Sequence, residues 1–176
     1  SGEDFSCGLD TAGSIECWGD NVYGQVSSVP SGSYIDIGLG MDHGCALDSA
    51  GDIECWGYDY DGQVSDVPTG TFSQLSVGFD HNCALDSDGY ITCWGYSSYG
   101  MLVPPVERFV SLSSGYYHNC ALDEDGEITC WGSDSYGQIS DVPSGSFVRL
   151  FSGDGNACAL DANGEAQCWG YFHYYL

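Results

Sequence analysis

The sequence predicts an all-β fold, a propeller-like array of about five short blades that each carry a disulfide within one hairpin. Three observations predict this fold class: a period of 37 or 38 residues, two cysteines ten residues apart in every period, and a glycine-containing turn between the two. The first cysteines of the pairs are Cys7, Cys45, Cys83, Cys120 and Cys158, and the second are Cys17, Cys55, Cys93, Cys130 and Cys168.

The hairpin is clearest in residues 81–95, where the short apolar runs "HNCALD" and "YITCW" flank the turn "SDG". Folding the segment about this turn pairs three positions: Cys83 with Cys93, Ala84 with Thr92, and Leu85 with Ile91. Opposed Cβ atoms lie ~4.5–5.5 Å apart, close to the ~3.8 Å of a disulfide. We therefore predict that each cysteine pair closes its own hairpin, which stabilises the fold by roughly 3 kcal/mol per loop in the chain-entropy model.

The five hairpin units lie near residues 2–19, 40–57, 78–95, 115–132 and 153–170, within one repeat domain that covers 1–176. Four connecting elements lie between them, and three of these, at residues 19–40, 57–78 and 132–153, contain a Gly-Gln turn, a short Val or Ile strand, a Pro-x-Gly turn and a strand that begins at an aromatic residue. About four short strands are thus expected in each period. Along the first strand of the hairpin, alternation points Cys83 and Leu85 one way and Ala84 the other, so both sheet faces are apolar and suit a blade between two neighbours.

The sequence has five hairpins but only four connecting elements, so we expect an open or incomplete ring. Three outcomes remain: a small ring closed by the aromatic tail, a segment of a longer array, or ends completed by neighbouring molecules. Unpaired strand edges and head-to-tail contacts generate filaments. The candidate assembly contact is the apolar tail, which packs within the chain or against another subunit: Tyr171, Phe172, Tyr174, Tyr175 and Leu176.

The composition excludes several partners. The 176 residues contain 26 Asp and Glu but only Arg108 and Arg149 as basic residues, so nucleic acid and anionic membrane surfaces are not expected to bind. No apolar run approaches the ~18 residues of a membrane span, so membrane insertion is not expected. Ten evenly spaced cysteines predict an extracellular protein, secreted or at a cell surface, and a chain that begins at Ser1 is expected to be a processed form or an excised segment.

The recurring succession "GxxHxCAL…G…CWG…YGQ" resembles the repeat of regulator of chromosome condensation propellers. The resemblance covers nearly the whole chain and rests on residues that recur in register: Gly40, His43, Gly51, Trp56, Gly57, Gly62 and Gln63 in one copy, and Gly78, His81, Gly89, Trp94, Gly95 and Gly100 in the next. It implies a propeller fold and, across the family, mostly binding work as scaffolds, exchange factors, inhibitors or receptor-like modules. The short repeats, the cysteine pairs and the acidic charge depart from the intracellular members, so nuclear exchange-factor chemistry is not expected.

Metal binding is one candidate chemistry. His43, His81 and His118 each stand two residues before a cysteine, which could give zinc three ligands. The outer copies keep both cysteines but have Phe5 or Asn156 in place of histidine, which favours disulfides. The turns with Asp86, Asp88, Asp123 and Asp125 suggest calcium, but the remaining turns have fewer carboxylates, so an aspartate that hydrogen-bonds backbone amides explains them better. No cofactor is expected.

Catalysis and sugar binding are two more candidate activities. The pairs Asp42–His43 and Asp80–His81 could suggest a hydrolase, but adjacent residues alternate across a strand and no residue is assigned as catalytic. Aromatic residues that follow "CWG" could bind sugars or fill the seams between blades: Tyr58, Tyr60, Tyr96, Tyr99 and Tyr136.

The sequence favours a non-catalytic extracellular structural or adhesive repeat protein that self-assembles into filaments. The second hypothesis is a lectin-like or protein-binding propeller module, and a hydrolase is third. The expected partners are the protein itself, a surface protein or a glycan.

Overall fold

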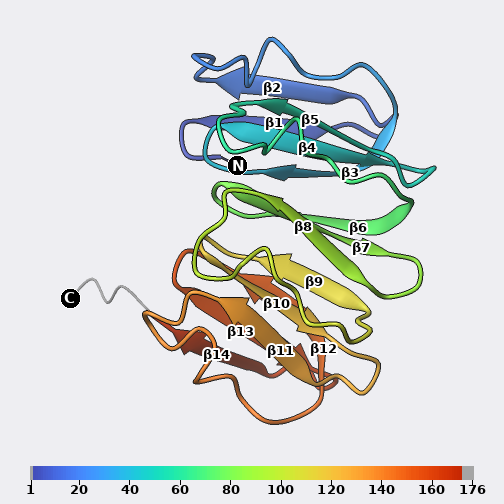
Figure 1. The fold of residues 1–176 in the computed structure, drawn as a ribbon. Helices are drawn as coiled ribbons and strands as arrows, with labels where there is room; N and C mark the ends of the chain where they lie inside the picture. The colour runs from blue at the N-terminus through green and yellow to red at the C-terminus, as the bar shows by residue number, and fades with distance from the viewer. Residues whose placement is uncertain (1, 172–176) are drawn as a thin grey trace.

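The computed structural model describes residues 2–171, which form five antiparallel sheets stacked in chain order (Figure 1). The first sheet has two strands, and each later sheet has three in the order in which they follow along the chain. The strands are β1 Phe5–Leu9, β2 Ile15–Gly19, β3 Tyr34–Leu39, β4 His43–Asp48, β5 Ile53–Gly57, β6 Phe72–Val77, β7 His81–Asp86, β8 Ile91–Gly95, β9 Ser111–Ser114, β10 His118–Leu122, β11 Ile128–Gly132, β12 Phe147–Ser152, β13 Asn156–Asp161 and β14 Ala166–Gly170.

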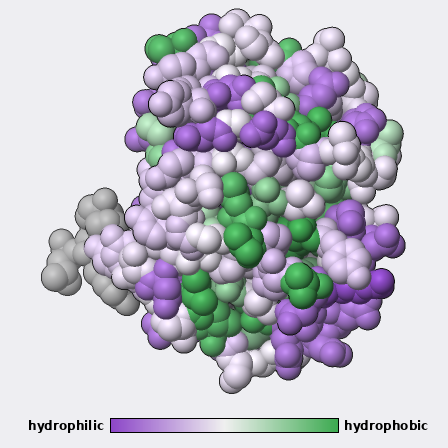
Figure 2. All heavy atoms as spheres, viewed as in Figure 1, coloured by the Kyte–Doolittle hydropathy of each residue, from purple (hydrophilic) through white to green (hydrophobic). Residues whose placement is uncertain are grey.

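The sheets form an open propeller-like array rather than a closed ring, because the first and last sheets lie at opposite ends of it (Figure 1). The outer strand of each three-stranded sheet comes from the connecting element before its hairpin, and the sequence has four such elements for five hairpins. Figure 2 shows the same view with hydrophobic residues in separate patches among hydrophilic ones. Within residues 2–171 no helix is long and apolar enough to cross a membrane.

The predicted hairpin register and disulfides are confirmed. Cys83 pairs with Cys93, Ala84 with Thr92 and Leu85 with Ile91 across β7 and β8. All ten cysteines form disulfides within their own hairpins, with Cα–Cα separations of 4.0 or 4.1 Å. Opposed residues at this spacing bring their Cβ atoms close enough for the bond to form without moving the strands apart.

The hairpin turns explain the repeated aspartates that could have suggested calcium. In the turn between β7 and β8, Asp86 Oδ1 accepts hydrogen bonds from the backbone N–H groups of Asp88 and Tyr90, both at 2.9 Å. Gly89 has a φ of +90°, a conformation that residues with a Cβ adopt at a cost. The remaining four turns repeat this pattern with Asp10, Asp48, Asp123 and Asp161 as acceptors.

The prediction of about four strands in each blade is wrong, because the segment after each Gly-Gln turn forms no strand. Asp59 Oδ1 accepts hydrogen bonds from the backbone N–H groups of Val64 at 2.8 Å and Ser65 at 2.9 Å. Asn21 and Asp134 make the same contacts in their connecting elements. A side-chain acceptor therefore takes the N–H groups that a strand ladder would have used.

Both faces of each inner sheet are buried against neighbours, as the alternation predicts. Ala84 and Trp94 pack against Cys45 and Leu47 of the preceding sheet. On the opposite face, Cys83 and Leu85 lie in one cluster with residues of the following sheet, namely Phe109, Leu112, Ala121 and Trp131. The hydrophobic core is thus divided among the seams between sheets instead of lying at one centre.

A tryptophan hydrogen bond recurs at every seam. The indole Nε1 of Trp56 donates to the backbone carbonyl of Gln25 at 2.9 Å, and Trp94 donates to that of Gln63 at 3.1 Å. Trp131 and Trp169 do the same to Met101 and Gln138. Each bond links a sheet to the connecting element that precedes it, and it satisfies an indole N–H that burial would otherwise leave unpaired.

A histidine and an asparagine meet across two of the seams. His43 Nε2 lies 2.9 Å from Asn82 Oδ1, and His81 Nε2 lies 2.8 Å from Asn119 Oδ1. The Asn82 amide also donates to the backbone carbonyl of Gln63. At the last seam Ala157 takes the place of the asparagine, and both ring nitrogens of the buried His118 have no hydrogen-bond partner in the structure.

We predict that Asn82→Ala lowers the free energy of unfolding by about 1–3 kcal/mol, because it leaves His43 Nε2 buried without a partner. Ala157→Asn is expected to raise it by about 1 kcal/mol, because the new amide can reach His118 and the carbonyl of Gln138. Urea unfolding of the oxidised protein measures both. In a His118→Ala background the gain from Ala157→Asn should disappear, and a gain that persists there would contradict the proposed contact.

Acid should destabilise the protein through its buried histidines. Burial lowers the pKa of His43 and of His118 to about 4, below the 6.5 expected in the unfolded chain. As the pH falls, the histidines of the unfolded chain therefore take up protons before those of the folded chain. The folded state is fully stable in this respect above pH 6.5 and loses stability as the pH falls from 6.5 toward 4. His118→Gln should flatten the decline in unfolding free energy across this window by up to about 3 kcal/mol. An unchanged pH profile would show that His118 is protonated equally in both states.

Candidate functional site

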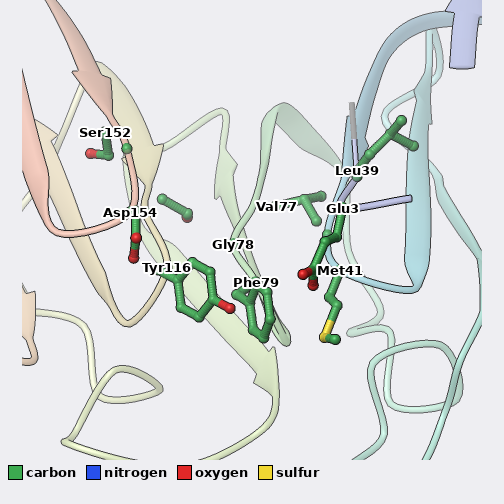
Figure 3. A pocket seen from close by; sticks show the side chains of 14 residues that line it. Glu3, Leu39, Met41, Val77, Gly78, Phe79, Tyr116, Ser152 and Asp154 are labelled. Carbon is green, nitrogen blue, oxygen red and sulfur yellow. The ribbon is translucent and has the colours of Figure 1, made fainter. Parts of the chain in front are cut away.

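A cavity of about 510 Å³ opens where five equivalent segments converge: the four turns between the first and second strands of the three-stranded sheets, and the segment before β1. We call these five segments the mouth turns and the cavity the mouth. One residue from each of the five turns lines it, together with the glycine before that residue: Glu3, Met41, Phe79, Tyr116 and Asp154. Figure 3 shows Phe79 beside Tyr116, with Met41 and Glu3 on one side and Asp154 on the other.

The glycine that begins each of these turns, and the histidine that follows three of them, are structural. A Cβ on Gly78 would lie 2.6 Å from the carbonyl oxygen of Gly115 and would also strike the ring of His81. A Cβ on Gly40 would lie 2.7 Å from the carbonyl oxygen of Phe79. These glycines are required because the inner ends of neighbouring sheets and the histidine rings approach too closely for a side chain.

The residue that directly follows the recurring glycine differs in all five turns. The two residues after the glycine read Glu-Asp at 3–4, Met-Asp at 41–42, Phe-Asp at 79–80, Tyr-Tyr at 116–117 and Asp-Gly at 154–155, so only the first of them differs in every copy. Positions that vary inside an otherwise repeated unit are free of the packing that holds the units together. The side chains that line the mouth are therefore those that the fold constrains least.

Backbone hydrogen bonds place neighbouring turns side by side. Met41 N–H donates to the carbonyl of Phe79 at 2.8 Å, and Tyr116 N–H donates to that of Gly153 at 3.1 Å. The rings of Phe79 and Tyr116 stack with centroids 3.5 Å apart and an angle of 21° between their planes. Tyr117 meets Tyr116 edge-on at 4.8 Å, which extends the stack into a cluster of three aromatic rings.

Tyrosines from the connecting elements surround the mouth at the same end of the sheets, because each of these elements begins where the last strand of a sheet ends. Tyr60 is 81% exposed and Tyr99 63% exposed, so these residues do not fill buried seams. Tyr58 and Tyr96 are half-buried, and Tyr136 is exposed. We call these five residues, which the sequence marked as candidate sugar contacts, the tyrosine rim.

Tyr99 has an unusual backbone conformation, with a φ of +53°, and no second non-glycine residue in the described part of the chain has a positive φ. In three connecting elements a glutamine Oε1 accepts the N–H two residues earlier, as Gln63 does from Asp61 at 2.9 Å. Met101 occupies the glutamine position after Tyr99 and cannot accept this bond. The rearranged turn holds the Tyr99 ring 5.9 Å from that of Tyr117.

The electrostatic field at the mouth is negative. Burial first, and then the neighbouring carboxylates of Asp61 and Asp42, together raise the pKa of Asp80 to about 6. Burial first, and then the effects of Tyr117, Glu3, Asp154 and Asp80, together raise the pKa of Tyr116 to about 12. The charges that act on these groups are therefore all acidic, and a cation at the mouth would be stabilised.

The structure uses the remaining candidate chemical groups elsewhere. Cys45 is bonded to Cys55, and His43 Nε2 contacts Asn82, so neither is poised for zinc. Asp42 accepts a hydrogen bond from Gln25 Nε2 at 3.0 Å, whereas His43 Nε2 contacts Asn82. Asp42 and His43 therefore form no catalytic dyad. Within the described residues no three or more His, Cys, Asp or Glu side chains are grouped to hold a metal ion.

The tail contact predicted from the sequence can be placed only at its first residue. Tyr171 stacks on Tyr136 with ring centroids 4.9 Å apart, and its carbonyl accepts a hydrogen bond from Asn156 Nδ2 at 2.8 Å. Phe172, Tyr174, Tyr175 and Leu176 lie outside the described residues.

The mouth residues were not singled out in the sequence, although a signal for them was present. Comparing the repeats position by position shows that the residue after each recurring glycine differs in every copy. Only the stacking of the sheets shows that these five separate residues converge on one cavity.

Together, the stacked sheets and their seam contacts define a β-propeller-type repeat protein. Residues 1–25, 72–100 and 109–138 match the family model described as the Regulator of chromosome condensation (RCC1) repeat. Three of the five hairpin units therefore match the RCC1 repeat, and all five units carry a disulfide within the hairpin. No curated protein matches the sequence.

Solved structures support this assignment. The chain is similar to the ectodomain of the receptor kinase CR4 from Physcomitrella patens, with 29% identity, a TM-score of 0.83, and 97% of this chain and 50% of that one covered. It is also similar to the ectodomain of the receptor kinase ACR4 from Arabidopsis thaliana, with 28% identity, a TM-score of 0.77, and 97% of this chain and 64% of that one covered. Prp20p from Saccharomyces cerevisiae shares the fold at 18% identity, with a TM-score of 0.79 and coverage of 96% and 56%. The chain thus spans only part of the length of these proteins.

Proposed function

We propose that this chain is an extracellular protein-binding module whose contact surface is the mouth and the tyrosine rim. The observation that carries this proposal is the convergence of non-repeating side chains from five turns on one cavity, at an end rich in exposed aromatic residues. Phenylalanine, tyrosine and methionine are enriched at protein interfaces, where they supply most of the apolar contact area.

Two observations support an extracellular location. Five disulfides in 176 residues persist in oxidising compartments and are rare where glutathione keeps thiols reduced. The similar plant structures are ectodomains of receptor kinases. Both agree with the secreted or cell-surface location that the cysteine content predicts.

Selection from a phage-displayed random peptide library on the immobilised protein tests the proposed surface. We expect the selected peptides to bind Tyr116→Ala at least roughly tenfold more weakly, because that change removes half of the aromatic stack. Tyr90→Ala is the matched control, since Tyr90 is an exposed tyrosine in a hairpin turn at the opposite end of its sheet. Isothermal titration calorimetry of the synthesised peptides gives the affinities.

Peptides that bind Tyr116→Ala and the unaltered protein equally well would contradict the proposal. So would a protein that selects no peptide but binds glycans on an array, because that outcome assigns the tyrosine rim to sugar recognition. Circular dichroism of Tyr116→Ala confirms that the variant is folded before binding is compared.

Self-assembly, the function that the sequence favours, is a second candidate supported by the first sheet. Trp18 in β2 is 57% exposed, whereas the equivalent Trp56 is 2% exposed against the preceding sheet. Among the described residues, the first sheet also has no third strand beside β1. We propose that a blade from a second copy covers Trp18 as each internal sheet covers the next.

Sedimentation velocity across a wide concentration range tests this second candidate. The protein should associate as its concentration rises, and Trp18→Ser should weaken the association by roughly tenfold or more, because a buried aromatic anchor dominates such contacts. Tyr90→Ala is again the control. A chain that remains monomeric at the highest concentration, or a Trp18→Ser variant that associates as strongly as the unaltered protein, would overturn the candidate.

A further inference from the structure

We propose that the mouth recognises an arginine side chain of its protein partner, with the guanidinium seated on the Phe79–Tyr116 stack between the carboxylates of Glu3 and Asp154. This inference rests on the proposed function and specifies the chemistry of the ligand. Guanidinium groups are planar and stack on aromatic rings, while their N–H groups pair with carboxylates. The mouth offers both kinds of contact in one cavity.

The geometry of the cavity suits an extended cationic side chain. Phe79 and Tyr116 are half-buried and lie side by side, and Tyr117 lies edge-on to both at 6.1 Å and 4.8 Å. Glu3 and Asp154 line opposite sides of the same cavity and are exposed (Figure 3). A guanidinium on the stack would thus lie in a cavity with an acidic group on either side.

The chain supplies no lysine to this site, and its two arginines lie elsewhere. Arg108 lies in the connecting element before β9, with its guanidinium carbon 5.4 Å from the ring centroid of Tyr90, and Arg149 lies within β12. The hydrogen bond to Tyr90 raises the pKa of Arg108 most, and the nearby carboxylates of Asp88 and Glu124 raise it as well. This contact thus already places an arginine on a tyrosine ring beside acidic groups. The mouth has the same combination of aromatic ring and carboxylates, and the arginine must come from outside.

The field at the mouth selects for positive charge. The carboxylates of Glu3, Asp154 and Asp80 all act on the Tyr116 phenol in the same direction as its burial. An organic cation fits better than a metal ion, because no metal-ligating group of three or more side chains is found among residues 2–171. With a net charge of −24, the whole chain would also steer a basic partner toward itself at low ionic strength.

An NMR titration with the blocked pentapeptide acetyl-Gly-Gly-Arg-Gly-Gly-amide tests the inference. We expect backbone shifts confined to the mouth turns and the tyrosine rim, and binding at least roughly tenfold weaker when citrulline, the neutral isostere, replaces arginine. Lysine should bind more weakly than arginine, because it lacks the planar fork. Higher salt should weaken the arginine peptide more than the citrulline peptide.

Single-charge variants distinguish the mouth from the general negative charge. Asp154→Asn and Glu3→Gln should each weaken binding of the arginine peptide by roughly three- to tenfold. Glu165→Gln is the matched control, because it removes one exposed carboxylate from the turn before β14, at the opposite end of the sheet. Equal effects of all three variants would overturn the inference by assigning the binding to overall charge.

The outcome separates this inference from the proposed function. If library-selected peptides bind the mouth but contain no arginine, and citrulline binds as well as arginine, the inference fails while the protein-binding function stands. If neither the selected peptides nor the arginine pentapeptide perturbs the mouth residues, both fail.

Discussion

The fold depends on one constraint: a sheet of three strands, each four to six residues long, has two apolar faces and cannot bury either of them alone. Each face must meet another sheet, so the chain can fold only by stacking its repeats. The hairpin disulfide makes this feasible because it holds the second and third strands of a sheet together. The tryptophan hydrogen bond, joined at two seams by the His–Asn contact, then fixes how one sheet packs on the next.

The same constraint determines where functional side chains can lie. Glycine, histidine, cysteine and tryptophan recur because the seams require them: a glycine such as Gly78 for close approach, a histidine such as His81 for its cross-seam partner, and a tryptophan such as Trp94 for its carbonyl acceptor. The turn residues that line the mouth are not required for these seam contacts. Chemical variety therefore gathers at the mouth, where five turns from otherwise similar repeats present five different side chains.

Much of the fold could be predicted from the sequence because the determining contacts are local and repeated. The pairing of Cys83 with Cys93 follows from a turn of known type, and the two-faced packing of Cys83 and Ala84 follows from strand alternation. The prediction of an extra strand was wrong because Asp59 and its equivalents accept hydrogen bonds from the backbone N–H groups five and six residues later. The mouth could not be predicted, since Glu3 and Asp154 come to line one cavity only when all five sheets are stacked.

Peptide mapping of the oxidised protein without reduction shows whether each disulfide closes its own hairpin. We expect five disulfide-linked peptide pairs, each joining cysteines ten residues apart within one hairpin, and no free thiol. A disulfide that joined different sheets, or a hairpin with two free thiols, would contradict this expectation, because the stacked sheets would then lack the covalent support from which their seams and the mouth are built.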